Sequence, residues 1–73
     1  MNLTDIVQTK NKDVKNGRNT YITPSKSFDG FTKGELIWVK SYDDSAIVVF
    51  RPMDGNEHII EQQFLKYFKL TGR

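Results

Sequence analysis

Two runs of β-branched and aromatic residues, separated by a short acidic turn, constrain the fold of this chain more than any other stretch. They lie within residues 33–50. This pattern predicts a β-hairpin, with strands at 36–40 and 46–50 and a turn at 41–44. Both runs are apolar at consecutive positions, which is typical of strands covered on both faces or closed into a small barrel. We therefore expect the hairpin, including Trp38, to build the fold rather than to bind.

Three further strands are expected around this hairpin. Residues 19–23 are good β-formers that end at a proline, 57–60 follow an Asp-Gly turn, and 67–70 lie close to the end of the sequence. Residues 61–65 have no β character and are too few for an independent helix, so they predict one helical or 3-10 turn.

The loop that precedes the hairpin carries two aromatic residues, Phe28 and Phe31, around an Asp-Gly pair. A small core needs apolar area, and one aromatic side chain can bury about 150–250 Å². We therefore expect both rings to fold back over an edge of the core.

The first 18 residues are polar. Asn2 or Thr4 can cap a helical turn, but apolar residues are few, and Asn11 and Gly17 disfavour a longer helix. We expect one helical turn or a frayed strand, followed by an exposed and mobile loop. The expected organisation is a polar segment at 1–18, a barrel at 19–70 and a tail at 71–73.

This order of elements resembles the SH3-like barrels over about residues 19–70. The resemblance rests on residues 31–35 at the end of the long loop, on the turns at 42–44 and 54–56, and on the helical turn before the last strand. It implies a mainly all-β fold, a five-stranded barrel. An OB-type barrel is the alternative, although it usually has more residues and a longer helix.

Peptide-binding SH3 domains carry a Trp and a Pro at positions that Trp38 and Pro52 do not match. The chain looks more like the small barrels of nucleic-acid-associated and phage-encoded proteins. Because small barrels host many activities, the resemblance implies a fold and not a function.

Composition narrows the possible functions. The chain has 73 residues and no cysteine, which excludes disulfides and thiolate metal sites. It lacks an apolar run near the ~20 residues of a membrane span and lacks a signal-peptide core, so we expect a cytoplasmic protein without a membrane partner. His58 is the single histidine, and no nucleophile, metal-ligand or phosphate-loop spacing accompanies it. We expect no enzymatic activity, no cofactor and no metal.

Positive charge collects towards both ends of the sequence, with net +2 over residues 1–18, +3 over 64–73 and −3 between them. Phosphate contacts need Lys and Arg, and unpaired bases stack on exposed aromatic rings. The last strand interleaves both kinds of side chain, and the tip of the hairpin adds a tyrosine. The candidate binding residues are Lys66, Tyr67, Lys69, Arg51, Tyr42, Lys10, Lys12, Lys15 and Arg18.

These features favour a binding module, a small phage-type or bacterial accessory protein that binds and modulates a host protein or a nucleic-acid-associated complex. The alternative is direct binding of DNA or RNA through the basic and aromatic residues. The sequence leaves the partner and the oligomeric state open.

Overall fold

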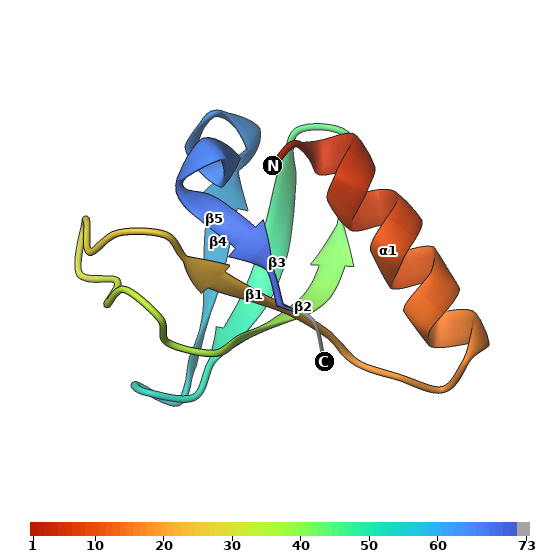
Figure 1. The fold of residues 1–73 in the computed structure, drawn as a ribbon, viewed down its shortest axis with the longest axis horizontal. Helices are drawn as coiled ribbons and strands as arrows, with labels where there is room; N and C mark the ends of the chain where they lie inside the picture. Colours follow the sequence, from red (N-terminus) through yellow and green to blue (C-terminus); the bar gives the residue numbers. More distant parts are fainter. Residues whose placement is uncertain (72–73) are drawn as a thin grey trace.

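The computed structural model describes residues 1–71 of the chain, and the fold is mainly β, with five antiparallel strands in one sheet (Figure 1). The strands follow one another in space in the order β4-β3-β2-β1-β5. The elements along the chain are α1 (Leu3–Lys15), β1 (Thr20–Pro24), β2 (Ile37–Tyr42), β3 (Ala46–Arg51), β4 (Asn56–Glu61), the 3-10 helix η1 (Gln62–Tyr67) and β5 (Phe68–Leu70).

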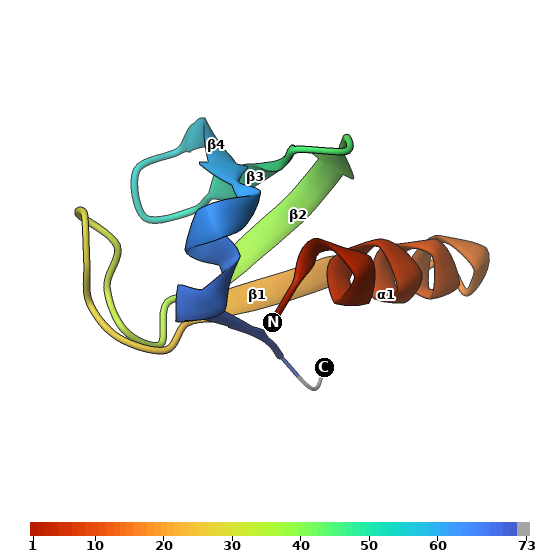
Figure 2. The same cartoon turned by 90° about the horizontal axis from the view of Figure 1, so that it is seen from above.

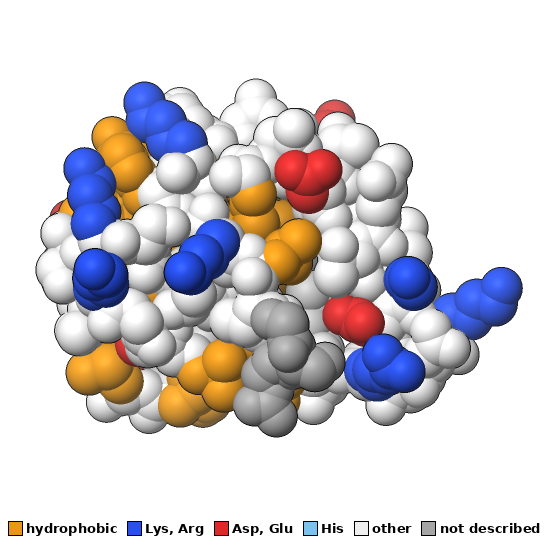
Figure 3. Space-filling view, in the orientation of Figure 1, with side chains coloured by type: hydrophobic (Ala, Val, Ile, Leu, Met, Phe, Trp, Pro, Cys, Tyr) orange, Lys and Arg blue, Asp and Glu red, His pale blue; other side chains and the backbone are white. Residues whose placement is uncertain are grey.

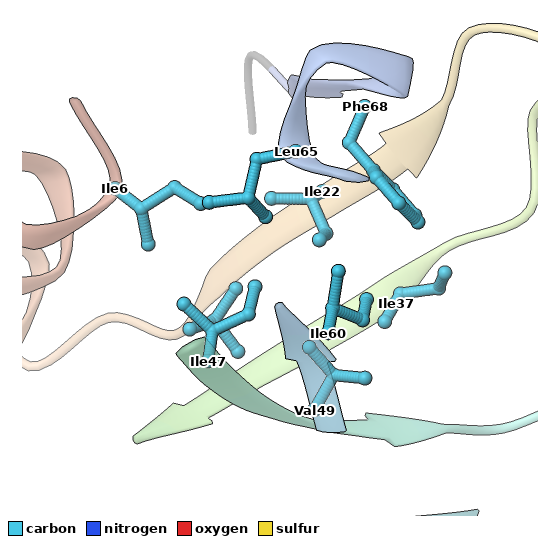
Figure 4. Close-up of a cluster of buried hydrophobic side chains, with 9 residues drawn as sticks. Ile6, Ile22, Ile37, Ile47, Val49, Ile60, Leu65 and Phe68 are labelled. Atoms are coloured by element: carbon cyan, nitrogen blue, oxygen red, sulfur yellow. The ribbon is translucent and has the colours of Figure 1, made fainter. Parts of the chain in front are cut away.

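The core lies between the inner face of the sheet and the two helices. Successive residues of a strand point to opposite faces, so the register of the pairs assigns each side chain to a face. Figure 4 shows Ile6 of α1 and Leu65 of η1 facing Ile22 of β1. The buried cluster consists of Ile6, Ile22, Ile37, Val39, Ile47, Val49, Ile60, Leu65 and Phe68.

The five strands and the helical turn before the last strand confirm the fold class expected from the sequence. The bounds differ at the hairpin, where β2 continues to Tyr42 past a bulge between Val39 and Ser41. The turn is then closed by Asp43, whose Oδ1 accepts hydrogen bonds from the N–H groups of Ser45 and Ala46.

Helix α1 has 13 residues, so the expected single turn followed by a mobile loop was wrong. Asn2 is the N-cap and forms a capping box with Asp5. The remaining stabilisation comes from tertiary packing, because Ile6 is fully buried in the core. The helix ends at Lys15 with Asn16 as its C-cap, and the next residue, Gly17, has a positive φ of 69°.

The loop between β1 and β2 lies at the opposite end of the molecule from α1 (Figures 1 and 2). Phe28 and Phe31 exchange two main-chain hydrogen bonds across Asp29 and Gly30, both of which have positive φ. This is the tight turn that Asp-Gly favours. Both rings pack against the core, as expected. No helix within residues 1–71 is long and apolar enough to cross a membrane.

Candidate binding surfaces

The outer face of the sheet carries a row of aromatic side chains across three neighbouring strands. Tyr21 of β1 pairs with Trp38 of β2, and Trp38 pairs with Phe50 of β3. The rings of Trp38 and Phe50 meet edge to face with 6.3 Å between their centroids. Val48 and Ile59 form the next pair on the same face, and Ile59 is 72% exposed. We call these five residues the outer apolar face.

The outer apolar face is open because α1 and η1 both contribute to the core on the inner face. Tyr21, Trp38, Val48 and Phe50 are each partly exposed. Trp38 therefore lies on the outer face of the sheet and outside the buried cluster of the core. Sequence reasoning missed this face because apolar residues at consecutive positions predict burial on both sides, and strand register was not known.

The charges around the outer apolar face largely cancel. Lys40 forms an ion pair with Glu57 of β4 across the strand between them. Glu61 lies on the same face of β4, two residues beyond Ile59. Lys69 is exposed on β5, two strands away from Trp38.

Two of the predicted site residues, Lys66 and Tyr67, lie in contact just before β5. The Nζ atoms of Lys26 and Lys66 lie 4.4 and 5.3 Å from the centre of the Tyr67 ring, and Phe28 packs on the same ring at 4.9 Å. Lys69 follows two residues later. No carboxylate of the described residues forms an ion pair with Lys26, Lys66 or Lys69. Lys26 was missed by the sequence analysis because it comes from the long loop.

Three other predicted site residues have partners inside the molecule. The Nε atom of Arg51 donates to Glu35 Oε1 at 2.6 Å, and its Nη2 atom donates to the Gly30 carbonyl at 2.7 Å. Lys10 Nζ donates to the Val39 carbonyl at 3.0 Å. The Tyr42 hydroxyl donates to Asn11 Oδ1 at 2.9 Å. These contacts hold the long loop and α1 to the sheet.

The last predicted cations, Lys12, Lys15 and Arg18, are exposed at the C-terminal end of α1 and just beyond it. Figure 3 shows Lys and Arg side chains in two groups at opposite ends of the visible face. The main-chain N-terminus does approach β5, since the Met1 ammonium donates to the Phe68 carbonyl at 3.5 Å. The basic side chains nevertheless do not merge into one patch.

Three carboxylates have a lowered pKa. Burial raises the pKa of Glu35. The hydrogen bonds from Arg51 and from the Thr32 N–H, together with the charge of Arg51, outweigh this effect, so the net shift of the pKa is downward. The Asn56 N–H is the largest cause of the lowered pKa of Asp54, and His58 and Arg51 add to it. The N–H groups of Ser45 and Ala46 and the Ser45 hydroxyl lower the pKa of Asp43. All three carboxylates therefore act as charged acceptors that fix turns and the long loop.

Two hollows flank these surfaces. A groove of about 680 Å³ lies between α1 and the β2–β3 turn. A cavity of about 190 Å³ lies beside β4, with walls from the long loop and η1. Within residues 1–71, no three His, Cys, Asp or Glu side chains gather in a way that could hold a metal ion.

Comparison with protein-family models, with curated proteins and with solved structures finds no match to this chain in any of the three.

Proposed function

We propose that this chain is a non-enzymatic binding module with an SH3-like barrel that docks a protein partner on its outer apolar face. The observation that carries the proposal is the row of Tyr21, Trp38 and Phe50, aligned across three strands and partly exposed. Contiguous exposed apolar surface marks interaction sites. Trp and Tyr are also among the side chains that most often dominate binding energy at interfaces.

The charges beside this face favour a protein over a nucleic acid. Phosphate binding needs unpaired Lys and Arg side chains. Lys40 is paired with Glu57, and Arg51 is held by Glu35. Glu61 adds a negative charge on the β4 side. An exposed apolar face with paired charges beside it fits an accessory protein, of phage or bacterial type, that modulates a host or bacterial protein by occupying it.

The test is capture of a partner from a bacterial lysate by the immobilised full chain, with and without nuclease. We expect the chain to capture a specific protein whether or not nuclease is present. Trp38→Ala should weaken the affinity for that protein by at least about tenfold. Val14→Ala is the matched control, because Val14 is also apolar and is 64% exposed, but lies on α1. Loss of every partner on nuclease treatment, or equal capture by Trp38→Ala, would contradict the proposal.

A second candidate is direct binding of single-stranded nucleic acid around Tyr67. The observation that favours it is the placement of Lys26 and Lys66 over the Tyr67 ring, with Lys69 close by in the sequence. Such a cluster offers phosphate contacts beside an aromatic side chain. Phe28 already packs on the same ring, which limits stacking of a base there.

A salt titration with a labelled oligonucleotide separates the two candidates. Direct binding predicts that the logarithm of the affinity falls linearly with the logarithm of salt, with a slope of about −0.7 for each phosphate contacted. Lys66→Ala should then lower the slope, whereas Lys15→Ala, at the far end of the molecule, should not. No retention at low salt excludes this candidate.

A further inference from the structure

The outer edge of β4 is a free sheet edge. Strand β4 is the terminal strand of the sheet, and in the described chain no strand pairs with its other side. The Gln62 N–H donates to the Ser45 carbonyl at 2.9 Å. Hydrogen bonds alternate along an antiparallel pair, so this contact places the bonds to β3 at Ile60 and His58. Glu57 and Ile59 therefore direct their N–H and C=O groups away from the sheet.

A cavity with aromatic walls lies beside this edge. Its volume is about 190 Å³, and it is lined by Phe28, Asp29, Phe31, Ile59, Ile60, Glu61, Phe64 and Phe68. Ile60 lies on the inner face and Ile59 on the outer face, and both residues line the cavity. A strand added to β4 would turn alternate side chains towards this cavity.

Carboxylates surround the edge and select the charge of an added strand. Glu61 on its outer face and Asp29 on the wall of the cavity form no ion pair within residues 1–71, whereas Glu57, on the other side of Ile59, is already paired with Lys40. A second copy of this chain, paired antiparallel about Ile59, would bring Glu57 of one copy opposite Glu61 of the other. Like charges in directly opposite positions destabilise a pair of strands.

We propose that the free edge of β4 accepts an extended segment of a partner protein as a sixth strand, with large apolar side chains turned into the cavity and Lys or Arg beside Glu61. Main-chain hydrogen bonds then supply affinity and the alternating side chains supply specificity. This proposal rests on the proposed protein-binding function; it adds the free edge of β4, which meets the outer apolar face at Ile59, and it gives the chemistry of the bound segment.

The test uses a blocked seven-residue peptide of alternating lysine and phenylalanine as the probe, with a peptide of alternating glutamate and phenylalanine as the control. Amide hydrogen exchange is followed by NMR on the full chain. We expect the lysine peptide to slow exchange of the Glu57 and Ile59 amides at least tenfold. The His58 and Ile60 amides already bond to β3 and should change little. Exchange that is unchanged at Glu57 and Ile59 overturns the proposal.

Two variants separate main-chain pairing from other contacts. Ile59→Pro removes an N–H that does not bond to β3 and should weaken the lysine peptide at least tenfold. Ile59→Lys keeps the strand, since this side chain is exposed, and should weaken the same peptide by charge repulsion. If Ile59→Pro does not fold, Ile59→Lys carries the test, and unchanged affinity of a folded Ile59→Lys overturns the proposal.

Two other outcomes also overturn the edge proposal, and they leave the proposed function standing. The first is peptide binding that perturbs Trp38 and Phe50 without protection at Ile59, which assigns the peptide to the outer apolar face alone. The second is concentration-dependent dimerisation that Ile59→Lys abolishes, which assigns the edge to a second copy. Loss of all nuclease-resistant partners in the lysate experiment would instead remove the proposed function.

Discussion

Arg51 joins the end of β3 to the long loop between β1 and β2 through one side chain. Its guanidinium makes two hydrogen bonds to the Glu35 carboxylate, at 2.6 and 2.9 Å, and a third to the Gly30 carbonyl. The Glu35 side chain is 3% exposed and that of Arg51 is 13% exposed. A two-pronged contact of this kind is strong and directional. It fixes the long loop against the end of β3, next to the cavity beside β4.

We expect Glu35→Gln to lower the free energy of unfolding by about 3 kcal/mol, because it leaves the charge of Arg51 without its buried partner. Urea denaturation followed by Trp38 fluorescence measures this change. Glu57→Gln is the control, because its pair with Lys40 is exposed and should be worth less than about 1 kcal/mol. If the two substitutions lower the free energy of unfolding equally, burial does not make the Arg51–Glu35 pair more stabilising than the Lys40–Glu57 pair.

Helix α1 packs against the sheet through a single fully buried side chain, Ile6, with Leu3 and Met1 packed partly against the same cluster. Polar contacts add to this packing, since Lys10 and Asn11 bond to β2. The helix therefore belongs to the same cooperative core as the strands, although its sequence is polar.

Ile6→Ala should lower the free energy of unfolding by about 2–4 kcal/mol, because it leaves a cavity at the contact between α1 and η1. Val14→Ala removes a similar side chain from an exposed position of the same helix and should change it by less than about 0.5 kcal/mol. Thermal unfolding followed by circular dichroism compares the two. If Ile6→Ala leaves the free energy of unfolding unchanged, α1 unfolds independently of the sheet.

Across the whole molecule, several carboxylates are held in hydrogen bonds within the fold, whereas many of the lysines are exposed. Glu35, Asp43 and Asp54 each have a lowered pKa because they accept hydrogen bonds within the fold. Figure 3 shows Lys and Arg side chains in two groups at opposite ends of the visible face. Acid therefore acts on the turns and the long loop before it affects the basic surface.

This arrangement predicts a loss of stability in acid. A carboxyl with a lowered pKa in the folded state contributes stability above its unfolded pKa, and the contribution is lost as pH falls through the folded value. The free energy of unfolding should therefore be constant near neutral pH. It should decrease once the pH drops below the ordinary pKa values, 4.5 for Glu and 3.8 for Asp. Chemical denaturation at a series of pH values measures the profile. Glu35→Gln should flatten it, and an unchanged slope in that variant would exclude Glu35 as a cause.

The strands were predictable from the sequence because β-branched residues, Asp-Gly turns and the proline after 19–23 are local signals. The length of α1 was not, because its stability depends on Ile6 meeting η1 and β1, contacts that the sequence does not encode locally. Among the candidate site residues, the sequence grouped Lys66, Tyr67 and Lys69 near the last strand, and the structure brings Lys66 to the Tyr67 ring. It had no signal for Lys26, which the long loop brings to the same ring.

The outer apolar face could not be predicted for a different reason. Residues 36–39 and 46–50 are apolar at nearly every position, so alternation cannot separate the face that packs from the face that stays open. Only the pairing of Trp38 with both Tyr21 and Phe50 assigns these rings to one side. Likewise, the partners of Arg51 depend on the path of a loop whose course the sequence left undefined.

The pairing of β1 with β5 has a consequence for synthesis on the ribosome. Ile22 and Pro24 pair with Leu70 and Phe68, so β1 cannot complete its hydrogen bonds until the chain has been made as far as residue 70. At the usual rates of translation this delay is roughly 2–10 s. During that time one side of β1 lacks its neighbouring strand, and an unpaired strand edge of this kind is prone to aggregation.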